Sequence, residues 1–149
     1  MTKSQRSCKD EASLGADEET SIVREATESA PVYDLEERTA RFGEAIIDFA
    51  RKIPRGPLTD RIINQLVGVG TSVGANYIEA DDSVSKNEFL KCIGTCKKES
   101  WETKHFLRMI ARAIPELQAD ARELWLEARA LHLIFSRIWR TGKQKEQGK

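Results

Sequence analysis

Two residues of the chain match half of a metal-binding pattern. Glu102 and His105 form the Glu-x-x-His unit of di-iron helical bundles, in which two helices each carry the unit and two others each add a glutamate. A second unit is missing, because the residue three positions before His132 is Arg129 and not an acid. The sequence therefore predicts no metal and no other cofactor, and both histidines are interpreted as surface or interface residues.

The cysteines and histidines do not combine into a catalytic set either. Cys92 and Cys96 face the same side of a helix, but His105 lies nine residues past Cys96, which is about 180° around the axis. The cysteines are therefore interpreted as thiols, two of them packed on or near a helix seam. The sequence has only two histidines and no visible group of nucleophile, base and acid. We predict that the protein is not an enzyme and has no catalytic residues.

Three glycines, Gly68, Gly70 and Gly74, approach the spacing of a dinucleotide-binding loop. That loop needs a preceding strand and a downstream acidic residue within a βαβ unit, and this context is missing. Glycine inside a helix costs about 1 kcal/mol relative to alanine. The cluster therefore predicts that another helix packs closely against this one.

The composition predicts one all-α domain. The 149 residues are 32% charged and 7% aromatic, with 24 basic and 24 acidic side chains and a net charge of zero. No apolar run approaches the ~20 residues of a membrane span, and the polar start has no secretory apolar core, so we expect a cytoplasmic protein. We expect a flexible tail over residues 1–32, a helical bundle over 33–140 and a second flexible tail over 141–149.

Proline residues and capping signals divide the bundle into four helices. Asp34 is the expected N-cap of the first helix, which Pro54 ends, and Ser85 with Glu88 forms a capping box that opens the third helix, which Pro115 ends. Apolar residues spaced alternately by three and four predict an antiparallel up-down-up-down bundle. The four lines are Leu35, Thr39, Phe42, Ile46, Phe49 and Ile53; Ile62, Leu66, Val69, Val73, Asn76 and Ala80; Phe89, Ile93, Cys96, Ser100, Thr103, Leu107, Ile110 and Ile114; and Leu117, Ala121, Leu124, Ala128, Leu131, Phe135 and Ile138.

Polar residues run beside two of these apolar lines. We interpret them as a buried polar layer that sets helix register and oligomeric state. Paired carboxylates for acid-base catalysis are the alternative, but no histidine, lysine or cleft visible in the sequence supports it. The predicted layer consists of Gln65, Ser72, Asn76, Glu79, Glu99, Glu102 and Thr103.

The fourth helix carries a second aromatic line. Trp125, His132 and Trp139 repeat every seven residues beside the core line. They could simply widen the core stripe. We favour an oligomer interface, because aromatic residues are enriched where proteins associate.

Four cations follow one side of the third helix. Lys97, Lys104, Arg108 and Arg112 are separated by seven, four and four residues, which places them away from the core line. A solvated face is the ordinary meaning of such a stripe. The alternative is a weak, sequence-tolerant nucleic-acid interface that contacts phosphates and not base edges.

The run from Gly70 to Tyr77 resembles a known family, together with residues that follow it. These are Glu79, Ala80, Ser85, Phe89, Lys98, Glu99, Glu102 and Thr103. The family comprises four-helix bundle proteins first noticed as reading frames within intervening sequences of bacterial 23S rRNA genes. The resemblance implies assembly into a homopentameric barrel. Most members of the family have no assigned activity. A related protein, the accessory variability protein of diversity-generating retroelements, is a basic pentamer that binds nucleic acid and a reverse transcriptase.

Two functions remain from these observations. The favoured one is a non-enzymatic oligomeric helical bundle that acts as an RNA- or nucleic-acid-associated scaffold. The alternative is a structural bundle that binds a protein partner and has no role with nucleic acid. The expected partners are further copies of the chain and, as possibilities, RNA or DNA and a protein encoded nearby. A membrane is not expected as a partner.

Overall fold

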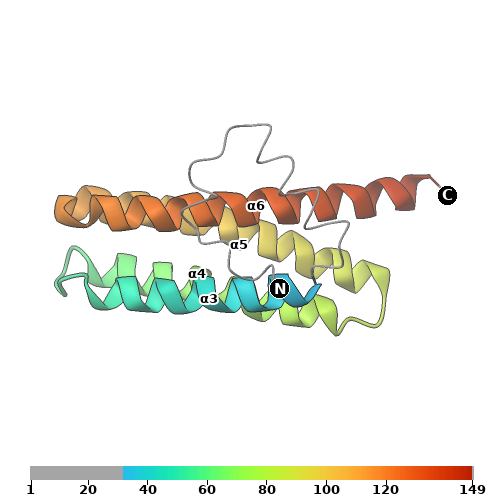
Figure 1. The fold of residues 1–149 in the computed structure, drawn as a ribbon, viewed down its shortest axis with the longest axis horizontal. Coiled ribbons are helices and arrows are strands. Elements are labelled where there is room, and N and C mark those ends of the chain that lie inside the picture. The colour runs from blue at the N-terminus through green and yellow to red at the C-terminus, as the bar shows by residue number, and fades with distance from the viewer. Residues whose placement is uncertain (1–31, 149) are drawn as a thin grey trace, which may run out of the picture.

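The computed structural model describes residues 32–148, and in this part of the chain all regular structure is helical (Figure 1). Helix α3 spans Val32–Arg51, α4 spans Asp60–Asp81, α5 spans Lys86–Ala113 and α6 spans Gln118–Gln147. A single 3₁₀ turn, Pro115–Leu117, joins α5 to α6. The predicted all-α class and the four helices are confirmed for these residues.

The four helices form an antiparallel bundle in chain order. Each helix packs along the next one, and Figure 1 shows α3 with α4 on one side of the bundle and α5 with α6 on the other. Helices α3 and α6 touch over much less of their length. Two ion pairs reinforce that narrow contact: Arg38 with Glu127, whose closest atoms are 2.6 Å apart, and Lys52 with Asp120 at 3.4 Å.

The apolar lines predicted from the sequence form the core. Most of their members are buried, including the polar positions Thr39, Ser100 and Thr103, and the rest are half-buried. Tyr77 of α4 meets Phe135 of α6 across the bundle, with 5.8 Å between ring centroids. The alternating spacing of three and four therefore identified the inward face of each helix correctly.

The helix ends agree with the capping signals at α5 and differ at α3. The Ser85 hydroxyl accepts from the Glu88 backbone N–H at 3.1 Å, and the Glu88 carboxylate accepts from the Val84 N–H at 3.2 Å. This arrangement confirms the predicted Ser85 cap. Helix α3, in contrast, begins at Val32, so the expected cap residue Asp34 lies inside the helix.

Most of the expected N-terminal tail, residues 1–31, lies outside the part of the chain that the structure describes. At the other end, α6 continues through Gln147, although a flexible tail was expected over 141–149. The extension packs on α5, because a methyl group added to Gly142 would collide with Leu90. Gly142 is therefore a contact residue that the polar composition of this segment did not reveal.

Two glycines of the cluster in α4 explain why α3 and α4 approach so closely. A Cβ atom on Gly70 would lie 2.9 Å from Ile46 Cγ1, and one on Gly74 would lie 3.3 Å from Thr39 Oγ1. A Cβ atom on Gly68 would meet nothing within 4 Å. Close helix packing is therefore confirmed for Gly70 and Gly74, but it does not account for Gly68.

Candidate functional site

Two sets of residues that the sequence placed on different helices meet on one face of the bundle. We call the surface formed by Lys97, Trp101, Lys104 and Arg108 of α5 with Trp125, His132 and Trp139 of α6 the α5–α6 face. The Lys97 ammonium lies 5.1 Å from the ring centroid of Trp139, and the Lys104 ammonium lies 4.6 Å from that of Trp125. The predicted cation stripe and the predicted aromatic line therefore touch.

Trp101 joins the two sets and was not identified from the sequence. The Lys104 ammonium lies 4.3 Å from its ring centroid, and the His132 ring lies 4.8 Å away. Its position offered a signal, since it lies four residues after Lys97 and three before Lys104, within the same stripe. Trp101 is 57% exposed, so the residue that links the two sets is open to solvent.

His132 is held in a fixed orientation between the two helices. Its Nδ1 lies 2.9 Å from the Lys97 carbonyl oxygen, which only accepts, so Nδ1–H is the donor. In the neutral ring Nε2 then accepts from the Ser136 hydroxyl at 3.5 Å. Burial lowers the pKa of His132; the bond to Lys97 opposes this, and the charges of Lys104 and Lys97 add to the lowering. The neutral form is therefore favoured.

Lys104 lies where several positive charges gather. Burial lowers its pKa, and the nearby charge of Arg129 lowers it further. Because both neighbouring rings present their electron-rich faces to the ammonium, cation–π attraction offsets part of the cost of burial. The α5–α6 face therefore gathers positively charged side chains in a protein whose net charge is zero.

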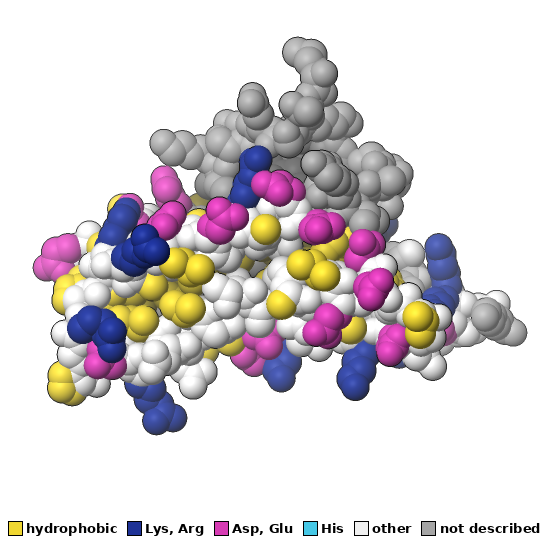
Figure 2. Space-filling view, turned by 90° about the horizontal axis from the view of Figure 1, so that it is seen from below, with side chains coloured by type: hydrophobic (Ala, Val, Ile, Leu, Met, Phe, Trp, Pro, Cys, Tyr) yellow, Lys and Arg dark blue, Asp and Glu magenta, His cyan; other side chains and the backbone are white. Residues whose placement is uncertain are grey.

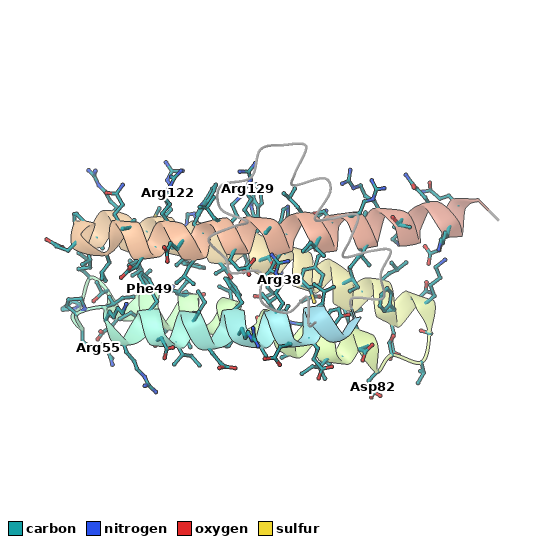
Figure 3. All side chains as sticks on the ribbon, in the orientation of Figure 1. Arg38, Phe49, Arg55, Asp82, Arg122 and Arg129 are labelled. Carbon is teal, nitrogen blue, oxygen red and sulfur yellow. The ribbon has the colours of Figure 1, made fainter. Side chains whose placement is uncertain are left out.

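The remaining charges of the bundle are distributed unevenly. Helix α5 has seven basic and three acidic residues and α6 has six and four, whereas α3 has three and five and α4 has one and three. Figure 2 shows several acidic side chains on the side formed by α3 and α4. In Figure 3, Arg122 and Arg129 point outward from α6. Arg108 and Arg112 are also exposed, farther along α5.

Three residues of the predicted polar layer form side-chain hydrogen bonds within their own helices. Asn76 donates to the Ser72 carbonyl at 2.9 Å, Ser72 to that of Val69 at 3.0 Å, and Thr103 to that of Glu99 at 2.7 Å. Gln65 and Glu79 are exposed, and the side chains of Glu99 and Glu102 are half-buried. Within residues 32–148, none of the seven side chains bonds to another helix. The physical reason is that short hydroxyl and amide groups reach a carbonyl one turn back more easily than a neighbouring helix.

The predicted interface residues already have partners inside the chain. Trp125 and Trp139 are half-buried against the core, and His132 contacts α5 as described above. Trp139 also lies against α5 at Gly94, where an added Cβ would be 3.4 Å from Trp139 Nε1. The aromatic line thus seals the seam between α5 and α6, and its role between subunits stays a prediction.

The part of the chain between residues 32 and 148 offers no cluster of three or more metal-ligating side chains. His105 instead packs edge-on against Phe106, with 5.3 Å between their ring centroids. None of the helices in this range has the length and apolarity needed to cross a bilayer.

Comparison with known proteins reveals a similar fold. No model of a known protein family matches the chain, and no curated protein matches it. Among solved structures, it is similar to a protein of unknown function from the S23 ribosomal protein family of Bacteroides thetaiotaomicron VPI-5482. The TM-score is 0.64 at 18% identity, and the alignment covers 73% of this chain and 97% of that one. At this identity the similarity concerns the fold alone.

Proposed function

We propose that the protein is a non-enzymatic helical scaffold that binds nucleic acid through phosphate contacts on the α5–α6 face. The observation that carries this proposal is the row of Lys97, Lys104 and Arg108 beside the exposed ring of Trp101, on α5, one of the two helices in which basic residues outnumber acidic ones. On α3 and α4 the acidic residues outnumber the basic ones. Phosphate binding requires positive charge on one surface and not a positive total. The positions of the charges, and not their sum, therefore support the proposal.

We also infer that the chain is related to the family that its sequence resembles and that it assembles into a closed homo-oligomer, a pentamer by that resemblance. The fold shared with a protein of the S23 ribosomal protein family supports the relationship. If the subunits join through a surface other than the α5–α6 face, assembly would repeat that face around a ring and so multiply weak phosphate contacts. Light scattering on the full chain at micromolar concentration tests the assembly, and a monomer would contradict it.

The salt dependence of binding tests the nucleic-acid proposal. If Lys97, Lys104, Arg108 and Arg112 each neutralise one phosphate, affinity for duplex DNA should fall about a hundredfold between about 50 and 200 mM salt. Anisotropy of a labelled duplex measures this fall. The double substitution Arg108→Gln with Arg112→Gln removes two exposed cations, so the fall should shrink to about tenfold.

A matched control uses two exposed arginines on the opposite side of the bundle. Arg51→Gln with Arg61→Gln removes the same charge from α3 and α4 and should leave the salt dependence unchanged. Equal effects of the two double substitutions would show that binding follows total charge and not the α5–α6 face. No binding at the lower salt concentration would contradict the proposal.

A protein-binding bundle without nucleic acid is the second candidate, and one observation favours it. Ile47 and Leu58 are 38% and 68% exposed near the connection from α3 to α4, and Figure 2 shows apolar side chains gathered toward that end. Binding through such a surface would respond weakly to salt. A salt-independent complex that Leu58→Ser abolishes, combined with no binding to nucleic acid, would select this candidate.

A further inference from the structure

Trp101 is a large aromatic residue that lies on the surface of the bundle. Its indole is 57% exposed, whereas Trp125 and Trp139 are half-buried and pack against the core. An aromatic ring left in water forgoes the stabilisation that burial would supply. The exposed indole, outside the core, is therefore aromatic surface that is available to a ligand.

The contacts of Trp101 orient the ring and leave part of it free. Lys104 reaches from the next turn of α5 toward Trp125 of α6, and its ammonium lies between the two rings at 4.3 and 4.6 Å from their centroids. The His132 ring of α6, itself anchored to the Lys97 carbonyl, contacts Trp101 at 4.8 Å. One contact comes from α5 itself and the other from α6, and the exposed 57% of Trp101 leaves part of the indole accessible to a flat ligand.

The charges around Trp101 determine which flat ligand fits. Lys97 precedes it by one turn, Lys104 follows by one turn and Arg108 by two, all on the same side of α5. Arg129 of α6 adds a further positive charge close to Lys104. An accessible aromatic ring in a row of cations is complementary to a base attached to phosphates. An uncharged apolar peptide would gain nothing from these cations.

We propose that Trp101 stacks on an unpaired base, so that the α5–α6 face binds single-stranded nucleic acid in preference to a duplex. Lys97 and Arg108, on either side of the ring along α5, contact the phosphates that flank the stacked base. In a duplex each base is already stacked on its neighbours and its faces are covered, so Trp101 contributes little there. This inference rests on the proposed nucleic-acid function and specifies its ligand.

The inference also explains how an interface can be sequence-tolerant and still select a class of nucleic acid. Stacking uses the face of the base, which every base has, and not the donors and acceptors on its edge. The phosphate contacts carry no sequence information either. The surface would then distinguish single-stranded nucleic acid from a duplex, and Trp101 is the residue responsible for this preference.

The test compares two labelled probes of equal length, an unstructured oligouridylate and a DNA duplex, each titrated with the full chain at about 50 mM salt. Trp101→Leu keeps an apolar side chain but removes the aromatic face, and it should weaken oligouridylate binding about tenfold to a hundredfold. Duplex binding should change less than about twofold, because its phosphate contacts remain. Trp101→Phe keeps an aromatic ring and should recover most of the lost affinity.

A matched control and light scattering separate this inference from other roles of Trp101. Ile78 is also exposed, at 55%, but lies on α4, so Ile78→Ala should leave both titrations unchanged. Equal losses on both probes, or no loss on either, would overturn the stacking role while leaving the phosphate interface intact. A changed oligomeric mass of Trp101→Leu would overturn it in favour of a contact between copies. Failure of the unmodified chain to bind either probe would overturn the proposed function together with this inference.

Discussion

Replacing Gly68 by alanine should stabilise the protein and replacing Gly70 by alanine should not, although the two residues lie in the same helix two positions apart. Both substitutions remove glycine from the interior of α4, which by itself stabilises the protein by about 1 kcal/mol. They also restrict the unfolded chain to the same extent. The two variants therefore differ only in what the added methyl group meets in the folded bundle.

The structure gives that difference a sign and a rough size. At Gly68 the methyl group meets nothing within 4 Å, so Gly68→Ala should stabilise the protein by about 1 kcal/mol. At Gly70 it would lie 2.9 Å from two carbons of Ile46 and 3.2 Å from Ile46 Cβ. Ile46 is fully buried and branched at that carbon, so it cannot swing away. Overpacking of this kind costs about 1 to 3 kcal/mol.

When the gain of about 1 kcal/mol in helix propensity is subtracted from the overpacking cost, Gly70→Ala should be neutral or destabilised by up to about 2 kcal/mol. It should be less stable than Gly68→Ala by about 1 to 3 kcal/mol. Gly74→Ala should fall between the two, because its methyl group would lie 3.3 Å from Thr39 Oγ1. Urea unfolding of the three variants at one protein concentration measures the order, since self-association would otherwise shift the midpoints. If Gly70→Ala were as stable as Gly68→Ala, the close approach of α3 and α4 would not be the reason for Gly70.

Three further predictions concern side chains that join or line the helices. Glu127 is buried and pairs with Arg38, so Glu127→Gln should lower the free energy of unfolding by about 1 to 3 kcal/mol, as measured in urea; an unchanged value would mean that the pair adds nothing to closure between α3 and α6. The folded state lowers the pKa of His132 below its ordinary 6.5, so as the pH falls the unfolded chain binds this proton before the folded protein does. The contribution of His132 to stability is therefore present above about pH 6.5 and is lost as the pH falls through the pKa of the folded state. The parent and His132→Asn are compared by their free energies of unfolding at about pH 7.5 and 5.5, and the advantage of the parent should shrink at the lower pH. An advantage that grows at the lower pH would refute this sign. Asn76 bonds only to the Ser72 carbonyl, so Asn76→Ala should change the unfolding free energy by less than about 1 kcal/mol, and a larger loss in thermal or urea unfolding would reveal a bond across the bundle that the structure does not contain.

The residues of the candidate site were partly visible in the sequence. The stripe of Lys97, Lys104, Arg108 and Arg112 was identified because all four lie on one helix, where spacing fixes which side chains share a face. Trp125, His132 and Trp139 were identified for the same reason on another helix. That the two sets meet could not be derived, because the register between α5 and α6 depends on contacts such as Gly94 with Trp139 and Gly142 with Leu90, which are distant in sequence.

Local sequence by itself determined the helical class, the cap of α5 at Ser85 and the inward face of each helix, since these depend on hydrogen bonds and spacings within a few residues. Burial and side-chain partners were decided by the tertiary structure. Asn76 of α4 and Thr103 of α5 bond within their own helices and not across the bundle. Only packing shows that a methyl group on Gly70 would meet Ile46 while one on Gly68 would meet nothing within 4 Å. The exposure of Trp101 beside Lys104 and His132 likewise follows from how α6 lies on α5, because a helix sequence specifies directions around its own axis and not the distance to its neighbour.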